Sequence, residues 1–179
     1  LHLDTPLVAA GKPAAIIAAS AKDASLASQI VARVRQLTRA QLPAVDDAGV
    51  TDEDLKRSNV IVIGNYTGNK VAERLYVRRF TFEDYVYPGI AGAEPDADGP
   101  PVTGYVIRTV HDPFAFGHNC IVLAGSDPAG TAEAVKQFVV SLEGSGSLVV
   151  PQTVKVQFGT KQLMKPAYSK REIPEAQVD

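Results

Sequence analysis

Two continuous apolar runs, each closed by a small residue, constrain the fold more than any other feature of this sequence. Residues 13–19 (Pro-Ala-Ala-Ile-Ile-Ala-Ala) lead into Ser20, and residues 59–63 (Asn-Val-Ile-Val-Ile) lead into Gly64. Apolar runs without alternating polar residues are typical of strands that are buried on both faces, as in a parallel sheet covered by helices. We therefore expect a central sheet whose strands open into loops at Ser20 and Gly64.

Helical signals follow these runs. Apolar residues recur with helical spacing over residues 23–41, and residues 69–77 are expected to form a second helix. Thr51, followed by three acidic residues, predicts the N-cap of a short helix, and Ser126-Asp127-Pro128 predicts the start of a last one. The expected buried stripes are Leu26, Ile30, Val34 and Leu37 in the first helix and Ala132, Val135, Phe138, Val139 and Leu142 in the last.

The second half of the chain predicts a β-hairpin. The β-rich runs 104–110 and 119–125 are separated by eight residues, too few for a helical crossover, so they should pair antiparallel. Shorter strands are expected at 42–45, 148–150 and 154–158. The fold class that follows is α/β: an α/β sandwich with a mixed sheet, in the order β-α-β-α-β-α, then a β-hairpin and a C-terminal helix.

Length and the two ends suggest the domain organisation. We expect one domain over residues 1–158, with a long loop at 80–103 that is rich in Pro and Gly, and a linker or connector tail at 159–179. Because the sequence begins without Met and ends in a polar stretch, the chain is interpreted as a fragment of a longer polypeptide. A processed protein with loose termini remains the alternative.

Composition argues against several classes of protein. With 18 Lys and Arg against 20 Asp and Glu, the chain has no excess of positive charge for binding nucleic acid. The apolar runs are much shorter than the ~20 residues that span a bilayer, so no membrane span is expected. Cys120 is the single cysteine, which excludes an internal disulfide and any metal site built from several cysteines.

The loop at residues 64–70 is a candidate ligand site. It follows a predicted strand and precedes a predicted helix, where a phosphate-binding loop would lie, but its glycine spacing is wrong and Val71 replaces the hydroxyl residue of that motif. A turn with a helix cap is the simpler interpretation. A small polar ligand remains the alternative, with Asn65, Tyr66, Asn69 and Lys70 as binding candidates.

A second candidate lies in the hairpin turn. His111, Asp112 and His118 could bind a ligand or a transition metal, although a solvated turn is the favoured interpretation. No catalytic residue is predicted, because Cys120 lies within an apolar strand and no Gly-x-Ser-x-Gly elbow is present. Glu83-Asp84 and the acidic pair at 96 and 98 are interpreted as solvated, and no metal or cofactor is predicted.

The run Gly104-Tyr105-Val106-Ile107-Arg108, the run Ile121 to Gly130 and the helix ending at Phe138 together resemble a known domain. It is the small N-terminal α/β domain that precedes the catalytic barrel in β-hexosaminidases of glycoside hydrolase family 20 and α-glucuronidases of family 67. The resemblance covers roughly residues 13–157. Thr131-Ala132 stands where that family has Tyr-Gly, and the hairpin loop is longer, so the chain resembles a divergent member.

The resemblance implies a non-catalytic accessory domain that packs against the catalytic domain of the same polypeptide, in an extracellular or periplasmic enzyme. Aromatic residues dominate such interfaces, and the candidates here are Tyr76, Phe80, Phe82, Tyr85 and Tyr87. The alternative hypothesis is a stand-alone module that binds a glycan or another small ligand through the loop at 65–70 and the turn at 111–118.

Overall fold

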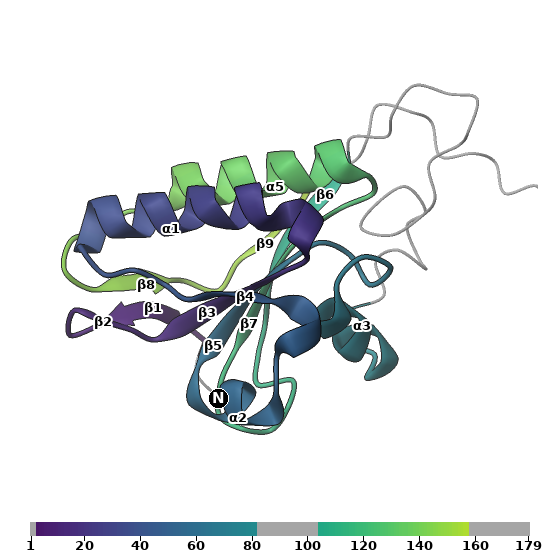
Figure 1. Cartoon of the computed structure of the whole chain (residues 1–179), viewed down its shortest axis with the longest axis horizontal. Coiled ribbons are helices and arrows are strands. Elements are labelled where there is room, and N and C mark those ends of the chain that lie inside the picture. The colour runs from purple at the N-terminus through teal and green to yellow at the C-terminus, as the bar shows by residue number, and fades with distance from the viewer. Residues whose placement is uncertain (1–2, 82–103, 158–179) are drawn as a thin grey trace, which may run out of the picture.

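A mixed sheet forms the centre of the molecule (Figure 1). The computed structural model describes residues 3–81 and 104–157, and within these residues the sheet has six strands in the order β4-β3-β5-β7-β6-β9. The strands are β3 (Ala15–Ala19), β4 (Ala44–Asp46), β5 (Asn59–Ile63), β6 (Tyr105–Val110), β7 (Cys120–Gly125) and β9 (Val154–Gln157).

The strand directions confirm the predicted mixed sheet. β3 pairs in parallel with β4 and β5, and β5 pairs in parallel with β7. β6 pairs antiparallel with both β7 and β9. β6 and β7 are the predicted hairpin, with an unbroken register from Tyr105 opposite Gly125 to Val110 opposite Cys120.

Helices cover both faces of this sheet. Figure 1 shows α1 (Ala24–Thr38) and α5 (Pro128–Ser141) along one face, and α2 (Asp52–Arg57) and α3 (Lys70–Val77) on the other. Successive residues of each strand therefore enter opposite cores: Ile61 packs on the α1 and α5 side, and Val62 packs on the α2 and α3 side. This explains why the strands are apolar throughout instead of alternating.

The predicted helix starts are confirmed at their caps. Thr51 and Asp54 form a capping box at the start of α2, and Asp127 caps α5 with Pro128 in its first turn. The first helix is shorter than predicted, because α1 ends at Thr38 and not near Gln41. Arg39 then adopts a left-handed conformation (φ 67°), which turns the chain toward β4.

A second, smaller sheet corrects the sequence interpretation. Its strand order is β2-β1-β8, formed by β1 (Thr5–Ala9), β2 (Lys12–Pro13) and β8 (Leu148–Val150). The first strand is thus β1 and not the run that begins at Pro13. β1 escaped prediction because Pro6 lies inside it, beside a register irregularity in its pairing with β8.

The small sheet is part of the main core. Leu7, Val8, Leu148 and Val150 are buried in the same cluster as Ile17 and the inner faces of α1 and α5.

None of the helices in the described residues combines the length and the apolar character that crossing a membrane requires.

Candidate functional site

The edge of the sheet where the parallel strands end is the first place to look for a site. After β3 the chain enters α1 on one face, and after β5 it enters α3 on the opposite face. Loops that diverge between neighbouring parallel strands create the crevice in which α/β proteins commonly bind ligands. The loop at residues 64–70, with the predicted candidates Asn65, Tyr66, Asn69 and Lys70, lies at this point.

Three successive main-chain N–H groups of this loop are already bonded within the loop. Thr67 N–H donates to Asn65 Oδ1 (3.1 Å), and the N–H groups of Gly68 and Asn69 both donate to the main-chain oxygen of Asn65 (3.1 and 3.0 Å). Asn65 Nδ2 in turn donates to Gly125 O (3.2 Å) at the end of β7. A loop that cradles phosphate needs outward-facing N–H groups, so this loop does not provide one.

The first N–H groups of α3 are also hydrogen-bonded within the protein. Asn69 Oδ1 accepts from the N–H groups of Val71 and Ala72 (2.9 and 3.1 Å), and Lys70 N–H donates to Asp47 Oδ2. The Lys70 ammonium extends outward to Glu73 (2.7 Å) as an exposed ion pair. The positive end of this helix is therefore capped by the protein's own oxygen atoms, which leaves little attraction for an anionic ligand.

Asn69 has a structural role that its sequence position did not indicate. Its side chain is 2% exposed, and Nδ2 donates to Ala18 O (3.0 Å) at the end of β3 and to Ile63 O (2.9 Å) at the end of β5. Together with the cap on α3, these bonds join two strands and a helix. Each hydrogen-bonding atom of the Asn69 amide is occupied by the protein itself.

Tyr66 and Tyr76 were predicted for different roles, and the structure brings them together. The rings stack with centroids 4.3 Å apart and an interplanar angle of 13°. Tyr66 comes from the loop after β5 and Tyr76 from the last turn of α3.

The hairpin turn lies at the other end of the sheet. Asn119, next to the turn, donates its N–H to Asn59 Oδ1 (2.8 Å) at the beginning of β5, whereas Asn65 follows the end of β5. The loop at 65–70 and the turn at 111–118 are therefore separated by the length of a strand. They do not form one ligand site.

Within the turn, the polar candidates are used to fold it. Asp112 Oδ1 accepts from the N–H groups of Phe116 and Gly117 (2.8 and 2.7 Å), and Asp112 N–H donates to Asn119 Oδ1 (3.1 Å). His118 Nε2 lies 2.9 Å from Lys56 O at the end of α2. Across residues 3–81 and 104–157, no group of three or more His, Cys, Asp or Glu side chains could hold a metal ion.

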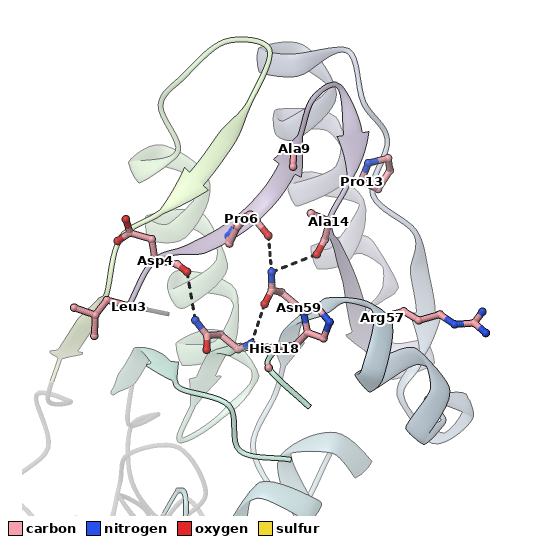
Figure 2. A pocket seen from close by; sticks show the side chains of 11 residues that line it. Leu3, Asp4, Pro6, Ala9, Pro13, Ala14, Arg57, Asn59 and His118 are labelled. Atoms are coloured by element: carbon pink, nitrogen blue, oxygen red, sulfur yellow. Dashed lines mark hydrogen bonds between the residues drawn. The ribbon is translucent and has the colours of Figure 1, made fainter. Parts of the chain in front are cut away.

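A groove of about 790 Å³ lies beside this turn, between the small sheet and the amino ends of β3 and β5 (Figure 2). One wall belongs to the small sheet and the other to the turn and the end of α2. The residues that line it are Leu3, Asp4, Pro6, Ala9, Pro13, Ala14, Arg57, Asn59, Gly117, His118 and Asn119. Of the predicted site residues, His118 alone belongs to this set.

Two buried side-chain amides, those of Asn59 and Asn119, line the groove. Asn59 Nδ2 donates to Pro6 O (2.9 Å) and contacts Ala14 O (3.4 Å), as Figure 2 shows. Asn119 Nδ2 reaches Thr5 Oγ1 (3.2 Å) and Asp4 O (3.4 Å). These bonds fasten the small sheet to the main one. Sequence reasoning missed the groove, although Asn59 at the start of an apolar run was a polar residue that required a partner.

Cys120 is not a nucleophile. Burial raises the pKa of its thiol to about 12, because the thiolate would lose its hydration in the apolar core beneath α3. A thiol with this pKa remains protonated at neutral pH and cannot attack a carbonyl group or bind a soft metal.

Of the five aromatic residues predicted to form a contact surface, two lie within the described residues. Tyr76 stacks on Tyr66, and Phe80 is partly buried against the core on the α3 side of the sheet. Phe82, Tyr85 and Tyr87 lie outside the described residues. Phe114, which was not singled out in the sequence, is covered by the guanidinium groups of Arg74 and Arg78 at 4.9 and 5.1 Å from its ring centroid.

Comparison with known proteins finds a distant structural match. No family model matches the sequence, and no curated protein matches it. Among solved structures, the chain is similar to a 4-O-methyl-α-glucuronidase of family GH115 with specificity for decorated arabinogalactans, with a TM-score of 0.48 and 17% identity. The match covers 84% of this chain and 18% of that chain, so the chain spans less than a fifth of that enzyme.

Proposed function

We propose that this chain is a non-catalytic accessory domain of a larger carbohydrate-active polypeptide and that it supports a neighbouring catalytic domain by packing. One observation carries the non-catalytic part: where an α/β fold normally binds its ligand, the N–H groups of residues 67–69 and the Asn69 side chain are bonded to the protein itself. The carbohydrate-active part is supported by the motifs at residues 104–138, and an extracellular or periplasmic location would accompany it.

Exposed apolar side chains support a packing role. Val149 is 46% exposed on the outer face of the small sheet, where it pairs with Pro6, and Leu3 is 52% exposed at the rim of the groove. At the far edge of the main sheet, Val154 and Val156 of β9 are also exposed. Apolar residues that a domain leaves in water are common where it meets a second domain.

The aromatic residues Tyr76, Phe80, Phe82, Tyr85 and Tyr87 are proposed as a further part of this contact surface. Tyr76 and Phe80 are partly exposed in the described part of the chain. Aromatic side chains are enriched in the buried centres of protein interfaces because they bury a large area with few rotatable bonds.

The first test measures the mass of the native polypeptide in its source with an antibody raised against this domain. A product several hundred residues longer is expected. A product near 19.0 kDa, the mass of the chain itself, would contradict the proposal, because no neighbouring domain would then exist in the same polypeptide.

The second test uses the full-length polypeptide with Val149→Asp. The thermal stability of the catalytic domain should fall, because a carboxylate would be buried at the contact, while the stability of the isolated 179-residue chain should change little. Gln152→Asp is the matched control, because it adds the same charge at an exposed position three residues away. Equal behaviour of the two variants would remove the small sheet from the contact surface.

A glycan-binding module is the second candidate function, and the stacked Tyr66 and Tyr76 rings favour it. Sugar rings bind aromatic faces, and Asn65 and Thr67 are adjacent polar residues. Titration with oligosaccharides, followed by chemical shifts of these residues and repeated with Tyr66→Ala, would test it. No response at millimolar oligosaccharide would eliminate this function.

A further inference from the structure

The groove between the small sheet and the β6–β7 turn has opposite charges at its two ends. Figure 2 shows Asp4 beside Leu3 at one end, Arg57 at the other, and His118 between them on the Arg57 side. The Arg57 side chain is largely exposed, and its ion pair with Glu53 is long (3.9 Å). Lys56 binds that same Glu53 more closely (2.8 Å), so the Arg57 guanidinium retains capacity for another carboxylate.

The middle of the groove offers apolar contact. Pro6, Ala9, Pro13 and Ala14 supply its wall on the side of the small sheet. The buried side-chain amides of Asn59 and Asn119 donate to oxygen atoms of the protein itself, as described above. Apart from the imidazole of His118, no aromatic ring lines the groove within the described part of the chain, so the groove lacks the flat aromatic face that a sugar would stack on.

We propose that this groove binds an extended protein segment in which a basic residue, an aliphatic residue and a carboxylate occupy alternate positions. Alternate side chains of an extended segment point the same way, so positions i, i+2 and i+4 can all face the groove. The basic residue pairs with Asp4, the aliphatic residue packs on Pro6 and Ala14, and the carboxylate pairs with Arg57. This inference does not depend on the proposed accessory function.

The chain's own sequence supplies a probe with this chemistry. Arg171, Ile173 and Glu175 stand at alternate positions in residues 169–177, Ser-Lys-Arg-Glu-Ile-Pro-Glu-Ala-Gln. A synthetic peptide of this sequence is the ligand to be titrated. The receptor is the full 179-residue chain with Arg171→Gln and Glu175→Gln, so that its own copy of the segment carries neither of the two charges and does not compete.

The experiment is an NMR titration of this receptor with the peptide. The amide signals of Ala9 and Gly117 should shift and saturate at millimolar peptide, the range expected for a short flexible ligand. Arg57→Glu in the receptor should weaken binding about fivefold or more, the size of a modest ion pair. Arg35→Glu on the exposed side of α1 is the matched control and should leave the affinity unchanged. Ala9→Phe, at an exposed lining position, should block the groove.

Exchanging the charges of receptor and peptide tests whether Arg57 recognises the peptide directly or only affects the folding of the receptor. The Arg57→Glu receptor should regain affinity for a peptide that carries Lys in place of the carboxylate at the Glu175 position. Absence of shifts at millimolar peptide would overturn the proposal, as would equal binding of a peptide that carries Gln at both the Arg171 and Glu175 positions. Xylohexaose shifting the same amides would identify a glycan site instead, and concentration-dependent shifts without peptide would identify a second copy of the chain as the occupant.

Discussion

Asn69 shows how one side chain can hold the end of the sheet together. It links Ala18 in β3, Ile63 in β5 and the first turn of α3 through four hydrogen bonds. From sequence a helix cap was the favoured interpretation of this residue, and ligand binding was the alternative. The structure shows the cap and two strand contacts, because burial to 2% exposure requires every polar atom of the amide to be satisfied.

Asn69→Ala should lower the free energy of unfolding by about 2 to 3 kcal/mol, the sum of a lost N-cap and two weakened main-chain acceptors. Lys70→Ala is the neighbouring control, and because it removes an exposed ion pair it should cost less than about 0.5 kcal/mol. Urea denaturation at pH 7 measures both. Equal losses would contradict the role given to Asn69.

Cys120 should be inert toward thiol reagents in the folded chain. Its pKa of about 12 and its full burial mean that a thiolate forms almost exclusively after unfolding. Ellman's reagent at pH 8 should react slowly with the native protein and at once in denaturant. Rapid reaction of the native protein would show that β7 opens readily beneath α3.

The burial of Cys120 also predicts that the free energy of unfolding depends on pH. In the unfolded chain the thiol ionises near its ordinary pKa of ~8.5, whereas the folded chain keeps the proton up to about pH 12. The unfolded state therefore binds fewer protons between these values, and the free energy of unfolding contributed by Cys120 falls as pH rises through this interval. Cys120→Ala lacks this contribution, so the difference in stability between wild type and variant should shrink above pH 8.5.

At the scale of elements, the end of β7 and the start of α5 approach unusually closely. A Cβ atom on Gly125 would overlap the main chain of Gly130 and Thr131, and one on Gly130 would overlap Gly104 O. Thr131 Oγ1 also accepts from Gly125 N–H (3.1 Å). The two glycines of the sequence Gly-Ser-Asp-Pro-Ala-Gly therefore allow the strand and the helix to pack closely. This role does not depend on a ligand.

Gly125→Ala should destabilise the protein by about 3 kcal/mol or more, because the main chain of α5 has to move away from the sheet. Gly49→Ala provides the comparison: no atom lies within 4 Å of its added Cβ, so its effect should stay within about 0.5 kcal/mol. Thermal unfolding followed by circular dichroism tests both. A neutral Gly125→Ala would mean that β7 and α5 are farther apart than described.

For the whole molecule, the continuity of the core decides how it unfolds. Leu7 of β1 and Leu148 of β8 are buried together with Ile30 of α1 and Phe138 of α5. The small sheet thus has no core of its own. It should lose its structure in the same transition as the main sheet.

Leu7→Ala should therefore cost about 2 to 5 kcal/mol and lower the midpoint of a single transition, with near-ultraviolet and far-ultraviolet circular dichroism changing together. Val149→Ala, on the outer face of the same sheet, should cost far less because its side chain is 46% exposed. Two separated transitions in the Leu7→Ala variant would instead identify the small sheet as an independent unit.

The main sheet and its helices were predictable because their signals are local. A strand buried on both faces is apolar at every position, an amphipathic helix repeats with its own period, and the caps at Thr51, Asn69 and Asp127 precede the helices they start. The small sheet was not predictable by these rules. β1 contains a proline, and its partner β8 lies some 140 residues away in the sequence.

By itself the sequence determined the α/β class, the hairpin and the helix starts, since each depends on residues that are neighbours along the chain. The tertiary structure alone decided which candidates meet. It placed the loop after β5 and the β6–β7 turn at opposite ends of a strand, stacked Tyr66 on Tyr76, and formed a groove between Pro6 and His118. These outcomes depend on strand direction and on contacts between distant segments, which arise from the packing of the whole core and leave no periodic trace in the sequence.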